Sequence, residues 1–207
     1  MKKKIILIIA TASTLFAQTV YQVTPGTKGN EITLTVANIS ETNPTANVNV
    51  SLAKKSSSLN FSKEEATIEN LEAKAEAEVK FTFDVSRNAI INKKDTIEFM
   101  ITSPDGIMTT KQFIFSYTGP TEFKLEQNFP NPFNPTTTIQ YQLPQDSKVI
   151  LKVYDILGSE VAALVNEEQE AGYKEVKFDA INFASGIYVY RLQAGNYIST
   201  KKMMLLR

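Results

Sequence analysis

The sequence predicts an all-β protein that consists of two tandem sandwich domains behind an N-terminal leader. Three observations lead to this prediction. Apolar and polar residues alternate in short runs, turn-forming residues separate the runs about every ten residues, and a proline-rich stretch near the middle of the chain interrupts the pattern once. With 207 residues, of which 43% are hydrophobic, the chain is long and apolar enough to form two small cores.

The first residues have the features of a secretory signal peptide. Three lysines follow Met1, an apolar stretch begins at Ile5, and the small residue Ala17 precedes Gln18. The apolar stretch has 13 residues, whereas a membrane-spanning helix needs about 20. We therefore expect a leader at residues 1–17 that the Sec translocon receives, with cleavage between Ala17 and Gln18 and no stable transmembrane anchor.

Composition excludes several classes of function. Basic and acidic residues both number 22, so the chain has no net field that would attract nucleic acid or an anionic membrane surface. The sequence has no His and no Cys, which excludes disulfides, the common zinc sites and the Ser-His-Asp and Cys-His nucleophiles. We expect no cofactor, and the chemistry left to the chain is that of carboxylate, Lys, Tyr and Ser groups.

Residues 18–118 are predicted to form the first domain. The runs EITLTVANIS and ANVNVSLA alternate apolar and polar residues, as half-buried antiparallel strands do. The run 96–117 contains the turn signal Pro-Asp-Gly at residues 104–106 and is predicted to be a hairpin. About seven short strands in roughly 100 residues are typical of an immunoglobulin-like sandwich.

The segment 73–85 carries two conflicting signals. Its Ala, Glu and Lys residues favour a helix by intrinsic propensity. Its apolar residues, however, recur at every second position from Ala73 to Val85, and a helix would need a spacing of three and four. We predict a strand.

Acidic side chains are the candidates for catalysis in the first domain, namely Glu64, Glu65, Asp84, Asp95 and Asp105. A paired-carboxylate site needs two acids about 5 to 9.5 Å apart, and nothing in the sequence shows that these converge. Glu64 and Glu65 have the pattern of a solvated loop, Asp105 belongs to a turn, and the alternating Asp/Asn loop of a dedicated calcium site is absent from the sequence. We predict no catalytic and no metal-binding residues.

The proline-rich stretch is predicted to open a second domain at residues 123–207, after a linker at residues 119–122. Proline fixes φ and restricts the preceding residue, so the stretch is expected to be stiff and cannot be a central strand. Phe129 and Phe133 are expected to dock onto an apolar surface. The domain-entry motif consists of Asn128, Pro130, Asn131, Pro132, Phe133, Asn134 and Pro135.

The second half has the same strand-like alternation as the first. A short helix remains an alternative at residues 161–165, because Val161, Leu164 and Val165 also have helical spacing. The predicted strands are residues 136–143, 147–157, 161–165, 173–178, 186–192 and 197–206.

Several spaced motifs of the second half carry a family resemblance. They are LEQNFPNPFNPTTTIQYQLP, VYDILGSEVAALV, AGYKEVKFDA, FASGIYVYRLQAGNY and KKMMLLR. Together they resemble the type A C-terminal sorting domain of the type IX secretion system, which is related to the immunoglobulin-like module of flagellar hook-capping proteins. The resemblance covers residues 123–207. One departure is Phe178-Asp179-Ala180, where many members have Trp-Asp-Gly, so that Phe keeps an apolar side chain and Ala replaces a flexible turn residue.

The resemblance implies a second immunoglobulin-like sandwich that addresses its cargo to an outer-membrane translocon in Bacteroidetes and related bacteria. The cargo is then released or fixed at the cell surface, often with removal of the domain. An edge strand at the C-terminus would suit β-augmentation by the translocon. The expected recognition residues are Gly186, Tyr188, Tyr190, Arg191, Lys201, Lys202, Met203, Leu205 and Leu206.

The leading functional hypothesis is therefore an exported protein, delivered to the cell surface or the medium, with a small non-enzymatic module for adhesion or structure. The alternatives are a small secreted hydrolase with carboxylate or Ser/Lys chemistry and a subunit of an extracellular appendage. The expected partners are the Sec and type IX translocons and a surface glycolipid or another cell-surface ligand, and nucleic acid is not among them.

Overall fold

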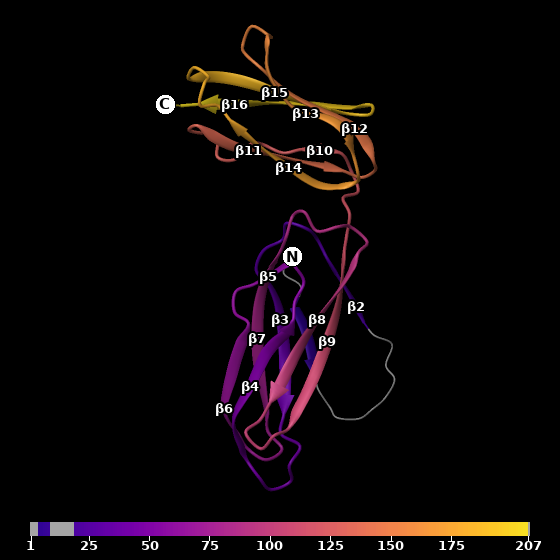
Figure 1. The fold of residues 1–207 in the computed structure, drawn as a ribbon, viewed down its shortest axis with the longest axis vertical. Helices are drawn as coiled ribbons and strands as arrows, with labels where there is room; N and C mark the ends of the chain where they lie inside the picture. Colours follow the sequence, from indigo (N-terminus) through magenta and orange to yellow (C-terminus); the bar gives the residue numbers. More distant parts are fainter. Residues whose placement is uncertain (1–3, 9–18, 207) are drawn as a thin grey trace. The chain divides into compact units, whose positions relative to one another are not determined.

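The computed structural model of the chain describes residues 4–8 and 19–206. Its elements are sixteen strands, and no helix occurs in the described residues. The chain divides into two compact units, Met1–Thr118 and Gly119–Arg207 (Figure 1). Each unit has a hydrophobic core of its own. The prediction of an all-β fold of the sandwich type is confirmed.

Most of the expected leader lies outside the described residues, as do Ala17 and Gln18 at the expected cleavage site. The described part is strand β1 (Lys4–Ile8), which pairs in parallel with strand β3 (Asn30–Ala37). The described ranges contain no helix of a length and hydropathy that could cross a membrane.

Unit 1 contains two sheets (Figure 1). The strand order is β1-β3-β7-β5 in the first sheet and β2-β9-β8-β4-β6 in the second. All pairs are antiparallel except β1 with β3 and β2 with β9. The remaining bounds are β2 (Val20–Val23), β4 (Thr45–Lys54), β5 (Leu59–Phe61), β6 (Glu65–Leu71), β7 (Glu76–Val85), β8 (Lys94–Thr102) and β9 (Met108–Tyr117).

The ambiguous segment is a strand, as its period of two predicted. Phe81 and Phe83 of β7 are buried and alternate with exposed Lys80 and Thr82, so burial on one face of a sheet outweighs helix propensity. The strand is shorter than the predicted row, because the amide of Ala75 bonds back to the carbonyl of Glu72 in a turn (3.1 Å).

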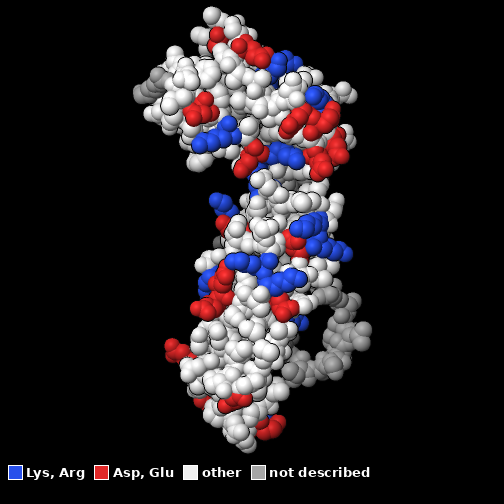
Figure 2. Space-filling model, viewed as in Figure 1, with Lys and Arg blue, Asp and Glu red and all other residues white. Residues whose placement is uncertain are grey.

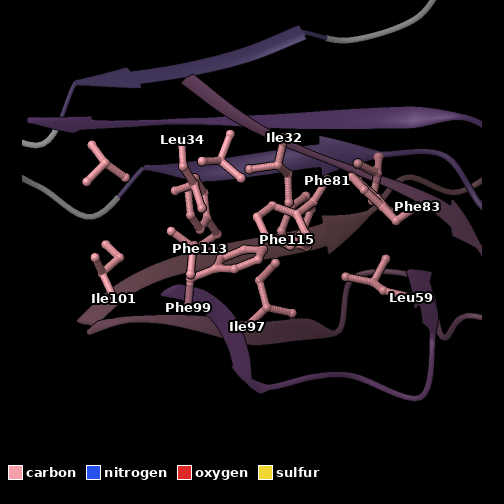
Figure 3. Packing of buried hydrophobic residues seen from close by; sticks show 14 of the residues in the cluster. Ile32, Leu34, Leu59, Phe81, Phe83, Ile97, Phe99, Ile101, Phe113 and Phe115 are labelled. Carbon is pink, nitrogen blue, oxygen red and sulfur yellow. The ribbon is translucent and has the colours of Figure 1, made fainter. Parts of the chain in front are cut away.

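Aromatic rings join the two sheets of unit 1. Figure 3 shows Phe81 and Phe83 of one sheet facing Phe99, Phe113 and Phe115 of the other. The ring centroids of Phe81 and Phe99 are 4.7 Å apart, and those of Phe83 and Phe115 are 5.5 Å apart at an interplanar angle of 72°. Tilted and edge-on pairs of this kind add stabilisation beyond that of the buried area.

A buried carboxylate ties a loop to the same core. Asp95 on β8 accepts hydrogen bonds from the hydroxyls of Ser56 and Tyr117 and an ion pair from Lys93, whose Nζ lies 3.1 Å from Oδ1. Burial alone would raise the pKa of Asp95, but these hydrogen bonds and the nearby Lys93 charge outweigh it and hold the pKa below the ordinary 3.8. Burial raises the pKa of Tyr117 to about 12. Asp95 is therefore charged and Tyr117 protonated at neutral pH.

Unit 2 also contains two sheets, with strand orders β10-β11-β14 and β13-β12-β15-β16. The helical alternative at residues 161–165 is wrong, because the segment belongs to a strand that pairs with β12 through two register shifts. The bounds are β10 (Lys124–Leu125), β11 (Thr136–Leu143), β12 (Ser147–Tyr154), β13 (Glu160–Gln169), β14 (Gly172–Asp179), β15 (Gly186–Ala194) and β16 (Tyr197–Leu205).

Removal of the Tyr117 hydroxyl tests the buried network. We expect Tyr117→Phe to lower the free energy of unfolding of unit 1 by about 1.5–3 kcal/mol, because a buried charge loses one of its donors. Calorimetry of the whole chain should show the shift in the transition of unit 1 and none in that of unit 2. The matched control is Tyr21→Phe, since no hydrogen bond of the Tyr21 hydroxyl occurs among the described residues and its ring, which the substitution keeps, is tilted by 45° against that of Phe113 at a centroid distance of 5.8 Å.

The lowered pKa of Asp95 gives the stability of unit 1 a defined pH dependence. A depressed carboxyl pKa stabilises the fold above the unfolded-state value near 3.8, and this contribution is lost as the pH falls through the folded-state pKa. We expect the stability difference between the wild type and Asp95→Asn to be constant from pH 7 to pH 5 and to shrink below about pH 4. Denaturation at stepped pH measures it, and a difference that grows on acidification would contradict the assignment.

Candidate functional site

The entry segment, defined as residues 127–135, lies along the last strand of unit 2. Phe133 and Leu205 form a parallel bridge, in which the amide of Phe133 bonds to the carbonyl of Met204 (2.9 Å) and the amide of Leu206 to the carbonyl of Phe133 (3.0 Å). Two motifs that are about 70 residues apart in sequence therefore form one structure.

Side chains of the entry segment extend this contact along β16. The side-chain oxygen of Asn131 accepts the amide of Met204 (2.9 Å), and the side-chain amide of Gln127 donates to the carbonyl of Lys202 (2.7 Å). Because β16 is the last strand of its sheet, these bonds close the edge that it would otherwise offer from Lys202 onward. The expected augmentation by a translocon strand would require the entry segment to leave if it used this part of the edge.

Asn128 fixes the start of the entry segment over the core. Its backbone amide donates to the hydroxyl of Tyr190 (2.8 Å), which in turn donates to the carbonyl of Glu126 (2.8 Å). Its side-chain amide donates to the carbonyl of Pro130 (3.1 Å) and to the hydroxyl of Thr137 (3.0 Å). Burial raises the pKa of Tyr190 to about 12, so the hydroxyl keeps the proton that this relay requires.

The two phenylalanines of the entry segment have opposite surroundings. Phe133 is buried, with its ring centroid 6.1 Å from that of Phe178, as predicted. The same prediction for Phe129 is wrong, because its side chain is 81% exposed. Its backbone exchanges two hydrogen bonds with Thr138, at 3.0 and 2.9 Å, which holds the residue beside β11 without inserting its ring.

The loop at the departure from the family pattern is well packed. Ala180 is fully buried, and its amide donates to the carbonyl of Pro135 (2.9 Å). Its φ is not positive, so the position does not need the conformational freedom of glycine. Phe178 packs against Phe183, with ring centroids 5.6 Å apart, and takes the place of the larger Trp.

The expected recognition residues fall into two groups. Tyr188, Tyr190, Met203 and Leu205 are buried and hold β15 and β16 to the core. A partner could contact them only after the unit had opened. The positions accessible in whole or in part are Gly186, Arg191, Lys201, Lys202 and Leu206.

Two of the accessible cations belong to a larger surface on the solvent side of the sheet. Arg191 lies opposite Lys152 in the pairing of β12 with β15, and Lys202 lies opposite Val189 in the pairing of β15 with β16. Lys152 also forms an ion pair with Glu160 (2.7 Å), and this hydrogen bond raises its pKa. We define the outer face as Lys152, Ile187, Val189, Arg191, Lys202 and Met204.

The outer face combines apolar and cationic groups. Ile187 and Met204 are 45% and 40% exposed, and a hollow of about 130 Å³ opens beside Lys152 and Arg191. Sequence reasoning selected Arg191 and Lys202 but missed Lys152 and Ile187. The signal was available, since Lys152 alternates with the inward residues Leu151 and Val153. Nothing in the local sequence could have indicated the role of Gln127 in closing the edge.

Four of the five acids considered in unit 1 have separate hydrogen-bond or ion-pair partners, namely Glu64, Asp84, Asp95 and Asp105. Asp84 accepts the amide of Gly29 (2.8 Å), Glu64 pairs with Lys55, and Asp105 lies in an exposed turn. Among the described residues, no group of three or more acidic side chains could hold a metal ion. Figure 2 shows cationic and acidic side chains intermixed on the drawn face.

Comparisons with solved structures find proteins of low sequence identity. Dimeric latent PorU from Porphyromonas gingivalis is 14% identical, with a TM-score of 0.34, and the match covers 94% of this chain and 19% of PorU. The CupB2 chaperone of Pseudomonas aeruginosa is 10% identical, with a TM-score of 0.33, over 91% of this chain and 98% of the chaperone. The calcium-binding domain CBD12 of CALX1.1 is 10% identical, with a TM-score of 0.32, and the match covers 84% of this chain and 77% of that protein. This chain thus spans about a fifth of the length of PorU. No curated protein matches the sequence.

The family comparison is specific to the second unit. Residues 127–206 match the model of the secretion system C-terminal sorting domain. The matched range begins at Gln127 and ends at Leu206, so it contains both the entry segment and the strand that the segment covers. Residues 127–206 are therefore a C-terminal sorting domain of the type IX secretion system, which marks the protein for export to the cell surface or the extracellular medium.

Proposed function

We propose that the exported protein carries unit 1 as a non-enzymatic module for binding, adhesion or surface structure, and that the outer face of unit 2 is what the type IX translocon recognises. The observation that supports a non-enzymatic unit 1 is the hydrogen-bonded environment of Asp95. It is the one buried carboxylate of the described residues, and three donors from Ser56, Tyr117 and Lys93 occupy it.

A hydrolase needs a general base or acid that titrates near its working pH. The hydrogen bonds hold the pKa of Asp95 below 3.8, and burial raises that of Tyr117 to about 12. Neither group changes protonation near neutral pH. The arrangement suits a structural crosslink between the loop at Ser56 and strands β8 and β9 far better than proton transfer, which supports a non-enzymatic unit 1.

The second half of the proposal follows from accessibility. The entry segment covers the edge of β16 from Lys202 onward, and the buried members of the family motif lie in the core. On the sheet that contains β15 and β16, a folded sorting domain offers a partner the apolar and cationic outer face. Apolar contacts with charged groups around them are typical of protein interfaces.

The outer face can be tested without opening the core. We expect the double variant Arg191→Glu and Lys202→Glu to lower the amount of protein exported by a type IX-competent strain by about tenfold or more, because charge reversal at an interface opposes docking. Immunoblots of medium, cell surface and periplasm measure the distribution. The matched control is Lys177→Glu on β14 in the other sheet, where export should continue. Normal export of the double variant would refute the outer face as the signal.

Deletion of residues 201–207 is a weaker test of the outer face, because it also removes Met203 and Leu205 from the core.

The contribution of the entry segment to the stability of unit 2 is tested separately by Tyr190→Phe, which breaks both hydrogen bonds of the relay to this segment. We expect a loss of about 1–3 kcal/mol in the free energy of unfolding of unit 2, measured by calorimetry. Tyr197→Phe, which keeps the ring stacked on Phe123 at 5.4 Å, should be neutral.

The enzymatic alternative has its own test. The secreted protein should show no turnover of glycan and peptide substrates, and Asp95→Asn should change its stability and leave any background rate unaltered. Turnover that a single substitution at Asp95 or another acid abolished would overturn the non-enzymatic assignment.

A further inference from the structure

A cavity of about 450 Å³ opens at one end of unit 1. It lies between the loop after β3, at residues 38–44, and the hairpin turn between β8 and β9, at residues 103–107. Its floor is the end of the apolar core, where Val36 and Leu71 meet Ile101, a residue that Figure 3 shows at the edge of the core cluster. Ligand pockets of proteins have this size and this apolar character.

The first wall of the cavity is held in place by its own polar bonds. The side-chain amide of Asn38 donates to the carbonyls of Asn43 (2.9 Å) and Leu71 (3.0 Å), and its oxygen accepts the amide of Ser40 (3.0 Å). Lys74 of the neighbouring turn pairs with Glu41 of the same loop. The loop is thereby fixed above the cavity and does not fill it.

The second wall is a closed turn. The amide of Ser103 bonds to the carbonyl of Ile107 (3.0 Å), and the amide of Gly106, with φ of 83°, bonds to the carbonyl of Ser103 (3.1 Å). A positive φ of this size suits glycine, so the turn is built for this conformation. Two preformed walls reduce the ordering cost of binding a ligand between them.

The groups around the cavity define the ligand that it can hold. Ile39 and Ile107 are 68% and 66% exposed and stand at its mouth. Asp105 is the one ionisable side chain of the lining.

From these features we infer that the cavity binds a small, uncharged and largely apolar molecule. The floor and the mouth supply apolar contacts. The carboxylate of Asp105 disfavours an anion. The inference rests on the proposed binding role of unit 1 and gives it a place and a ligand class.

Two fluorescent probes test the ligand class with the protein purified from culture medium. N-phenyl-1-naphthylamine is neutral and has one N–H group, and 8-anilino-1-naphthalenesulfonate has the same rings with an added sulfonate. We expect the neutral probe to bind about tenfold or more tightly than the anionic one, because the sulfonate would face Asp105. The substitution Asp105→Asn should lower the ratio of the affinity for the neutral probe to the affinity for the anionic probe. Equal affinities, or no binding of the neutral probe, would overturn the inference.

A pair of adjacent substitutions tests the location. Ile107→Glu places a charge at the mouth and should weaken the neutral probe by about tenfold or more. Met108→Glu is the matched control, because Met108 is 68% exposed, follows Ile107 directly and does not line the cavity. The affinity of the Met108→Glu variant for the neutral probe should stay within about twofold of the wild-type affinity. Ile39→Glu on the other wall provides a second variant if the first alters the unit 1 transition in calorimetry.

The outcomes separate the inference from the proposed function. If the Ile107→Glu and Met108→Glu variants bind the neutral probe equally well, the cavity is not its binding site, and the proposal of a non-enzymatic unit 1 is unaffected. Turnover of a glycan or peptide substrate refutes the proposed function and leaves the probe data valid.

Discussion

The sorting domain depends on the closure of one sheet edge. A strand at the end of a sheet has unpaired backbone groups that another chain can pair with, and β16 ends the sheet that carries the family motifs. Residues 127–133 meet this constraint from within the chain, with backbone bonds from Phe133 and side-chain bonds from Gln127 and Asn131. The rest follows, since the relay through Asn128 and Tyr190 fixes the segment that closes the edge.

The family motifs of the domain contain both buried and accessible residues. Tyr190 and Leu205 belong to the core and shape the sheet, whereas Arg191 and Lys202, their direct neighbours or near neighbours in sequence, point to solvent. Alternation along a strand places structural and accessible residues side by side in the sequence. A sequence motif therefore contains both kinds of residue, and only the alternation of side chains along the strand shows which are buried and which are accessible.

Local periodicity predicted most of the fold and little of the candidate sites. The period of two identified β7 against its helix propensity, and the turn signals separated the strands. The ring of Phe129 was misplaced because its pairing with Thr138 involves another strand. The bonds of Gln127 to Lys202 and of Tyr117 to Asp95, like the cavity beside Ser103, join residues that are distant in sequence. A pattern of neighbouring residues contains no information about such contacts.

The position of β16 at the far end of the domain sequence has a consequence for the order of synthesis. The entry segment is made first, and the strand that it covers is made last, so the bonds of Gln127, Asn131 and Phe133 to this strand form only after the ribosome has passed Leu206. A nascent chain that ends before Lys202 lacks Met203 and Leu205 from the core and Lys202 from the surface. The complete sorting domain therefore forms only on a chain that has been translated through Leu206, and we expect truncated chains to lack a functional export signal.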